Sequence, residues 1–130
     1  MSASYSDRVM DHFLNPRNVG VVKHADGVGE VGAAAIGDVL KISIRVRDGR
    51  IVEARFKAFG CGTAIAVTSV TTELIQGRTL DEVSRFSNQD VLAALGGLPA
   101  EKLNCPLLAE EAVKAALKDY WKQNRPAANA

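Results

Sequence analysis

Residues 40–58 read LKISIRVRDGRIVEARFKA, and this stretch predicts the centre of the fold. From Leu40 to Arg47, apolar side chains alternate with charged or hydroxyl side chains, which is the period of a strand with one buried face. The dipeptide Asp48-Gly49 is typical of a two-residue hairpin turn. The alternation resumes on the return strand, where the apolar positions are Val52, Ala54, Phe56 and Ala58. The stretch therefore predicts an antiparallel hairpin.

The segment before the hairpin predicts one helix and one weaker strand. Ser4 or Ser6 can cap a helix that stops at Asn15-Pro16, because the residue before a proline avoids helical geometry. The apolar face of this helix consists of Val9, Met10, Phe13 and Leu14. Glycines interrupt the apolar pieces of residues 19–37, so we expect a mobile loop with an edge strand around residues 30–34.

After the hairpin the apolar period becomes helical. Residues 64–75 predict a helix rich in small side chains, closed by Gly77. The pair Thr79 and Glu82 forms a capping box for a short helix. Ser87 opens another helix, which ends at Gly96-Gly97. Strands early in the chain and helices late in it predict an α+β fold, with helices on one face of a small antiparallel three-stranded sheet.

The last predicted helix is amphipathic. Its inward positions are Leu108, Ala112, Ala116, Leu117, Tyr120 and Trp121. Its outward positions are Glu110, Lys114, Lys118 and Lys122. The chain of 130 residues predicts one domain over residues 1–130, with a tail that frays from about residue 124.

Composition excludes several classes of protein. Sixteen basic and fifteen acidic residues give a net charge of +1, too little excess cation for a dedicated nucleic-acid binder. Apolar residues make up 47% of the chain, but no apolar run approaches the ~20 residues that cross a bilayer. The first residues lack the layout of a secretory signal, and two cysteines are too few for a disulfide scaffold. We therefore expect a soluble cytoplasmic protein that contacts neither nucleic acid nor membrane.

Both cysteines fall where a predicted helix begins. Cys61 lies between glycines ahead of the small-residue helix, and Cys105 precedes Pro106 at the start of the last helix. A helix N-terminus favours thiolate, the form that binds soft metals or attacks sulfur. A single cysteine is more often a small buried hydrophobe than a reactive thiol. Because both cysteines lie at predicted helix starts, we give the buried and the reactive interpretation about equal odds. Asp38 is a third candidate ligand, although a turn aspartate is the simpler interpretation.

The two histidines show no partner pattern. We place His12 on a helix surface and His24 in a loop.

Six blocks of sequence, in order from about Tyr5 to Tyr120, carry a resemblance to a known family. The blocks are YSDRVMDHFLNPRNVG (5–20), VGAAAIGDV (31–39), ARFKAFGCGTAIA (54–66), LDE (80–82), LPAEKLNC (98–105) and LAEEAVKAALKDY (108–120). In this order and at these separations they resemble the IscU/NifU-type iron–sulfur cluster assembly scaffolds. The resemblance implies an IscU/SufE-like fold and a protein that is not an enzyme. In this family a transient [2Fe–2S] cluster is built and passed to apoprotein acceptors.

The resemblance also implies a ligand set. Asp38, Cys61 and Cys105 match the aspartate, second cysteine and third cysteine of the family site, whereas Ile36 occupies the first cysteine position and Asn104 the histidine position. Because a [2Fe–2S] cluster takes four protein ligands, this set predicts iron, zinc or an incompletely ligated cluster. Cys105 would accept persulfide sulfur from a cysteine desulfurase.

Residues 98–102 resemble, at their two ends, the stretch that an Hsp70-type chaperone recognises in this family.

Two functions follow from these residues. The first is a scaffold that binds metal or cluster through Asp38, Cys61 and Cys105. The second is a degenerate paralogue, or a variant engineered at Ile36, that binds the desulfurase and regulates sulfur delivery without holding a cluster.

Overall fold

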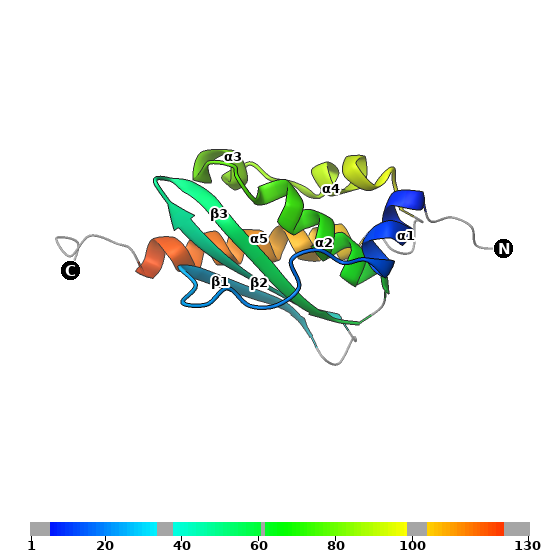
Figure 1. Cartoon of the computed structure of the whole chain (residues 1–130), viewed down its shortest axis with the longest axis horizontal. Coiled ribbons are helices and arrows are strands. Elements are labelled where there is room, and N and C mark those ends of the chain that lie inside the picture. Colours follow the sequence, from blue (N-terminus) through cyan, green and yellow to red (C-terminus); the bar gives the residue numbers. More distant parts are fainter. Residues whose placement is uncertain (1–5, 34–37, 61, 99–103, 124–130) are drawn as a thin grey trace.

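The computed structural model describes residues 6–33, 38–60, 62–98 and 104–123, with only the backbone described for Ala33, Asp38 and Asn104. Its elements, in chain order, are α1 (Asp7–Leu14), β1 (Gly27–Ala33), β2 (Asp38–Arg47), β3 (Arg50–Phe59), α2 (Gly62–Ile75), α3 (Leu80–Ser84), α4 (Asn88–Leu95) and α5 (Asn104–Gln123). The strands form an antiparallel sheet in the order β1-β2-β3, and Figure 1 shows the long helices α2 and α5 beside it. The predicted α+β class is confirmed.

The hairpin of β2 and β3 forms as predicted, with one change of register. Asp48 and Gly49 adopt φ of 52° and 74°, the left-handed pair that a tight hairpin turn requires. Arg45 lies opposite Glu53 and Val46 lies opposite Ile51, so Val52 has no partner and forms a β-bulge. The bulge exposes 47% of Val52 and buries Ile51 instead. The prediction that Val52 points into the core is wrong for this reason.

The edge strand β1 begins earlier than predicted, at Gly27. Gly27 and Gly29 face α5 and leave no room for a side chain. A Cβ atom on Gly27 would lie 2.4 Å from the carbonyl oxygen of Ala116, and one on Gly29 would lie 2.3 Å from that of Ala112. These glycines interrupt the apolar pattern in the sequence, but in the structure they allow α5 to lie directly on the strand.

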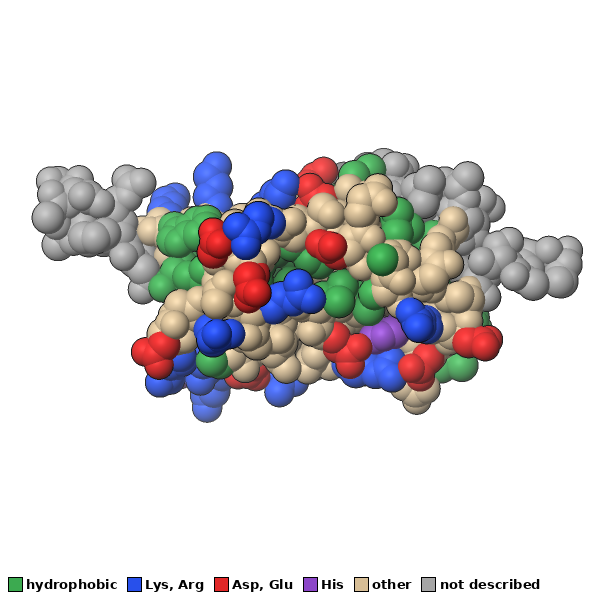
Figure 2. Space-filling view, turned by 90° about the horizontal axis from the view of Figure 1, so that it is seen from above, with side chains coloured by type: hydrophobic (Ala, Val, Ile, Leu, Met, Phe, Trp, Pro, Cys, Tyr) green, Lys and Arg blue, Asp and Glu red, His purple; other side chains and the backbone are tan. Residues whose placement is uncertain are grey.

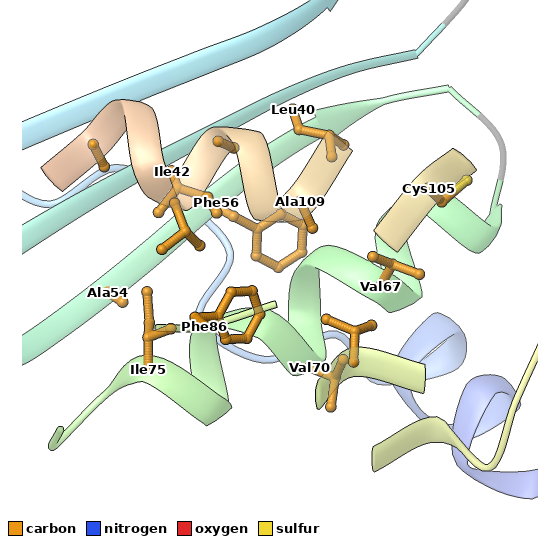
Figure 3. Packing of buried hydrophobic residues seen from close by; sticks show 14 of the residues in the cluster. Leu40, Ile42, Ala54, Phe56, Val67, Val70, Ile75, Phe86, Cys105 and Ala109 are labelled. Atoms are coloured by element: carbon orange, nitrogen blue, oxygen red, sulfur yellow. The ribbon is translucent and has the colours of Figure 1, made fainter. Parts of the chain in front are cut away.

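Helices cover the inner face of the sheet, and the core lies between the two layers. Leu40, Ile42 and Phe56 of the sheet pack with Val67 of α2 and Ala109 of α5, as Figure 3 shows. The capping box of Thr79 and Glu82 opens α3 as predicted. Ser87 also caps α4 as predicted, and Gly96 ends it with φ of 78°. Trp121, predicted to point inward, is 48% exposed near the end of α5.

Residues 18–20 pair with the free edge of β3, and the chain then crosses the opposite face of the sheet on its way to β1. Asn18 and Gly20 bond to the backbone of Phe56 on β3, and the N–H of Val22 donates to Ser43 Oγ in the middle of β2 at 2.8 Å. This crossing buries Ser43, a position that alternation alone would place in water.

The molecular surface carries charges of both signs. Figure 2, viewed from the side on which α2, α3 and α4 lie, shows acidic and basic side chains interspersed over this face. In the described part of the chain, no helix is both long and apolar enough to cross a membrane.

Candidate functional site

The ends of several elements meet at one end of the sheet. Asp38 is the first residue of β2 and pairs with Ala33, the last residue of β1. Next to it, Val39 pairs with Phe59, the last residue of β3. Helix α2 begins at Gly62, three residues after β3 ends. The backbone of Asp38 therefore lies beside the strand end that leads into α2.

Helix α5 approaches the same end of the sheet with its N-terminus. Gly27 faces Ala116 and Tyr120, whereas Gly29 faces Ala112 and Ala116, so β1 and α5 run in opposite directions. Two residues of a strand span ~6.7 Å and four residues of a helix span ~6 Å, so each pair of residues along β1 faces about one turn of α5. Extended to Ala33 at the end of β1, this alignment places the first turns of α5 beside the start of β2.

Cys105 is the second residue of α5, as the sequence predicts within one residue. Its side chain is only 4% exposed and belongs to the hydrophobic core cluster. Figure 3 shows Cys105 at the end of the cluster near Val67 of α2, with Ile75 at the other end. In this structure Cys105 is therefore a small buried hydrophobe, the simpler of the two interpretations of its sequence position. A ligand could reach its sulfur only if the residues that cover it moved.

The other proposed ligand positions are only partly described. Cys61 and Ile36 lie outside the described residues, as do most of the stretch 98–102 and the tail from residue 124. Asp38 and Asn104 are described by their backbone alone. Among the residues described, no group of three or more His, Cys, Asp or Glu side chains could hold a metal ion. The ligand set Asp38, Cys61 and Cys105 thus remains a prediction.

Three large apolar side chains lie near these element ends. Phe59 ends β3 and Leu107 lies in the first turn of α5, and both are exposed. The ring of Phe13 on α1 lies over the first residue of α2, since a Cβ atom on Gly62 would be 2.6 Å from its Cε1 atom. The start of α2 is therefore covered by a side chain of α1.

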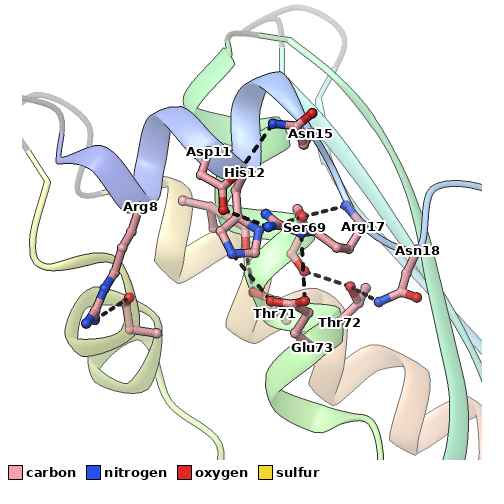
Figure 4. Close-up of polar contacts among 12 residues, drawn as sticks. Arg8, Asp11, His12, Asn15, Arg17, Asn18, Ser69, Thr71, Thr72 and Glu73 are labelled. Atoms are coloured by element: carbon pink, nitrogen blue, oxygen red, sulfur yellow. Dashed lines mark hydrogen bonds and ion pairs between the residues drawn. The ribbon is translucent and has the colours of Figure 1, made fainter.

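A polar network fastens α1 and the residues after it to α2 (Figure 4). His12 Nδ1 lies 2.8 Å from Ser69 Oγ, which also accepts the backbone N–H of Arg17 at 2.9 Å. His12 Nε2 lies 3.4 Å from Glu73 Oε1, and Arg17 binds Asp11 at 2.6 Å. The prediction that His12 lies on the helix surface is wrong, because it is 7% exposed and faces α2.

The surroundings of His12 favour its neutral form on balance. Burial lowers the pKa of His12 first, and the charge of Arg17 lowers it further, while Glu73 and Asp11 act in the opposite sense. A neutral imidazole can accept the Ser69 hydroxyl hydrogen at Nδ1 and donate from Nε2 towards Glu73. The signal that sequence reasoning missed is the spacing of Val9 and His12, which share one helix face.

Two buried threonine hydroxyl groups of α2 donate within the helix itself. Thr68 donates to the carbonyl of Ala64 at 2.6 Å, and Thr71 donates to that of Val67 at 2.7 Å. Such back-bonding lets a helix with few large side chains be buried on most of its surface. It also leaves Ser69 as the hydroxyl that reaches across to α1.

Comparisons with known proteins agree with this architecture. A family model described as "NifU-like N terminal domain" matches residues 4–127. The iron–sulfur cluster assembly scaffold protein IscU of Escherichia coli (strain K12) is 50% identical over 121 residues, which cover 90% of this chain and 94% of the relative. The chain belongs to the IscU/NifU-like scaffold family.

Further relatives of this IscU/NifU-like chain include one of two IscU scaffold proteins of Archaeoglobus fulgidus. It is 48% identical over 120 residues, which cover 92% of this chain and 78% of the relative. Among solved structures, the FiSufU protein of Fervidobacterium islandicum aligns with a TM-score of 0.70 at 21% identity, covering 89% of this chain and 98% of that one. At that identity the likeness bears on the fold alone, and it confirms the predicted architecture.

Proposed function

We propose that this protein is an iron–sulfur cluster assembly scaffold, which receives iron and sulfur and passes them on as cargo. The observation that carries the proposal is near-full-length similarity to relatives named as such scaffolds. A scaffold of this kind holds a product for transfer and does not turn over a substrate, so the protein is not an enzyme. Its partners would be a cysteine desulfurase as sulfur donor and apoproteins as acceptors.

Asp38, Cys61 and Cys105 are the proposed ligands of the cargo. Their support is the meeting of three element ends, since residue 38 opens β2, residue 61 precedes α2 and residue 105 lies in the first turn of α5. Two thiolates and one carboxylate leave a fourth position open for water, an added thiol or a second protomer. An open position suits iron, zinc or a weakly held [2Fe–2S] cluster better than permanent storage.

Cys105 would also accept sulfur from the desulfurase. The Cys105 thiolate attacks the outer sulfur of the donor's cysteine persulfide, so that Cys105 becomes the persulfide and the donor thiolate is released. Because Cys105 is buried in this conformation, the step requires the covering residues to move first.

The burial of Cys105 favours a second candidate function. If its sulfur stays in the core, the protein would act as a module that binds the desulfurase and regulates sulfur delivery without holding a cluster. Ile36, at the position where the family resemblance implies a cysteine, points in the same direction.

Anaerobic reconstitution separates the two functions. The chain is mixed with ferrous iron, cysteine and a catalytic amount of desulfurase, and its visible spectrum and bound iron are followed. A scaffold gains a cluster spectrum that is lost in Cys61→Ala. Colourless protein that still changes the rate of the desulfurase would contradict the scaffold and support the regulatory module.

Ile36→Cys tests the assignment of the missing ligand. A third thiolate at this position should raise the iron and sulfide bound per chain well above wild type. Val21→Cys is the matched control, because it adds an exposed thiol on the segment that crosses the other face of the sheet. Equal occupancy in Ile36→Cys and Val21→Cys would count against the proposed ligand set.

A further inference from the structure

Two lysines lie directly opposite each other on the outer face of the sheet, the face away from α2 and α5. The register of β2 and β3 pairs Lys41 with Lys57. Their neighbours along the strands, Leu40, Ile42 and Phe56, fill the core, so both lysines point outward. Cβ atoms of such a pair are ~4.5–5.5 Å apart, and like charges placed opposite each other are destabilising. The pair therefore works against the stability of the isolated chain.

No neighbouring carboxylate neutralises this pair. Among the residues that the structure describes, neither Lys41 nor Lys57 takes part in an ion pair. Glu30 lies opposite Lys41 on β1, but the two form no ion pair. Both lysines are thus available to a carboxylate from another molecule.

The next charged row of the same face has no carboxylate to spare. Arg45 and Arg55 both bind Glu53, at 3.9 and 2.7 Å. Together with the lysine pair, these rows of the sheet carry four cations against two carboxylates, those of Glu30 and Glu53. The outer face is therefore positive in a chain whose net charge is only +1.

An exposed aromatic ring lies beside the lysine pair. Phe59 follows Lys57 by two residues and therefore shares its face of β3, and it pairs with Val39, two residues before Lys41. Phe59 is 69% exposed, more than any other large apolar side chain in the described part of the chain. We call Val39, Lys41, Lys57 and Phe59 the lysine–phenylalanine patch.

The segment that crosses the outer face leaves the patch open. Its Val22 N–H donates to Ser43, one row further from these strand ends, and Ser43 is buried there. Lys57 and Phe59 are exposed by contrast, and Lys41 is half-buried. A partner can therefore reach the patch without any rearrangement of the fold.

Two unpaired cations beside an apolar ring fit an acidic protein surface. Carboxylates placed over the patch would relieve the repulsion within the lysine pair and would steer the encounter of the two proteins. The ring offers the aromatic contact that protein interfaces favour in their centre. Nucleic acid fits less well, because two unpaired cations neutralise too few phosphates for useful affinity.

We propose that the lysine–phenylalanine patch binds an acidic segment of an acceptor protein, with an apolar side chain of that segment packed on Phe59. The patch lies at the same end of the sheet as Asp38, a proposed ligand of the cargo. An acceptor bound there holds its own ligands close to the cargo before transfer. The inference rests on the proposed function for the identity of the partner, and on the structure alone for the binding surface.

Binding of a synthetic peptide to the apo chain tests the patch. The peptide carries one leucine flanked by glutamates, and its counterpart carries glutamines in their place. Amide chemical shifts in NMR spectra locate the binding and give Kd. The glutamate peptide should shift the amides of the patch and bind about ten-fold more tightly than the glutamine peptide at low salt. Raising the salt from roughly 0.05 to 0.5 M should remove most of this difference, because salt screens exposed charges.

Substitutions of exposed residues separate charge from apolar contact. Lys57→Glu should weaken binding of the glutamate peptide by about five- to ten-fold and should not lower Tm, since it relieves the repulsion from Lys41. Phe59→Ala should weaken binding several-fold and leave its salt dependence unchanged. Lys118→Glu is the matched control, because Lys118 is exposed on α5, in the helix layer on the other side of the sheet. It makes the same change of net charge and should alter Kd by less than about two-fold.

Several results would overturn the proposal. They are no binding of the glutamate peptide at low salt, shifted amides confined to another surface, and equal weakening by Lys57→Glu and Lys118→Glu. The lysines would then serve only to keep the sheet from pairing with other chains. Tighter binding of a short DNA duplex than of the glutamate peptide would also overturn it.

The peptide test requires no metal, so it fails separately from the proposed function. A chain that binds the glutamate peptide through the patch but never gains a cluster leaves this inference standing and overturns the scaffold. A chain that gains a cluster and delivers it to an apoprotein at the same rate in wild type and Lys57→Glu does the reverse.

Discussion

Replacing Gly29 by alanine should displace α5 from the sheet. The new Cβ atom would lie 2.3 Å from the carbonyl oxygen of Ala112, 2.5 Å from the nitrogen of Ala116 and 2.9 Å from the Cβ atom of Ala115. Carbon atoms in ordinary contact are ~3.5–4 Å apart, so the helix must retreat by about 1 Å. Two of the three opposing atoms belong to the backbone, which a change of rotamer cannot relieve.

The expected cost follows from the size of this clash. Overpacking a core by one methyl group costs about 1–3 kcal/mol, and displacement of a long helix belongs at the upper end of that range. Replacing a glycine in a strand by alanine, without a clash, stabilises the folded state by roughly 0.5–1 kcal/mol. We therefore expect a loss of about 2 kcal/mol in the free energy of unfolding and a fall in Tm of roughly 6–10 °C.

Urea unfolding followed by circular dichroism measures this loss, and Trp121 fluorescence reports on α5 in the same samples. Glu30→Ala is the matched control, because Glu30 is the next residue of β1 and is exposed, and its change should stay within about 0.5 kcal/mol. Gly49→Ala separates sterics from backbone conformation, since nothing lies within 4 Å of Gly49 but its φ is +74°. The reasoning fails if Gly29→Ala is as stable as wild type, or if Gly49→Ala costs more.

Two further predictions concern pH and charge. Burial lowers the pKa of His12 in the folded state below its ordinary value of 6.5. The contribution of His12 to stability should therefore be complete above pH ~6.5 and be lost as pH falls through the lowered pKa. Unfolding titrations at several pH values should show this loss, and His12→Gln should remove it. Glu110 accepts hydrogen bonds from Lys114 and Asn88, which lower its pKa to about 2. Its contribution to stability is therefore complete above about pH 4.5 and is lost as pH falls through about 2. Glu110→Gln should cost about 1–2 kcal/mol at pH 7 and little near pH 2, and an equal cost at both would contradict the assignment.

Local signals in the sequence predicted much of the architecture. The turn at Asp48-Gly49 and the capping box at Thr79 depend on a few adjacent residues, and the structure confirms both. Alternation predicted β2 correctly but misplaced Val52, because a bulge depends on how two strands pair and not on either strand alone. The position of Trp121 could not be predicted from its own helix either. It follows the apolar period of α5, but no neighbouring layer covers it near the end of the helix, and it is exposed.

Contacts between distant segments explain what the sequence did not predict at the candidate site. The burial of His12 depends on Ser69, 57 residues later, and the burial of Cys105 depends on how α5 lies against α2 and the sheet. The sequence predicted a cysteine at a helix start for position 105 and left open whether its side chain is buried or reactive, and the structure shows it buried. The relation of Cys61 and Ile36 to Cys105 stays a prediction.

The pairing of β1 with α5 has a consequence for the order in which the protein matures. The N–H of Val28 donates to Asp119, a contact that joins residues 91 positions apart. During synthesis, the glycine face of β1 stays uncovered until residues 104–123, which form α5, have left the ribosome. Contacts of such long range are slow to form, and an uncovered edge strand can meanwhile pair with other chains. The nascent protein should therefore be most prone to aggregation just before α5 emerges.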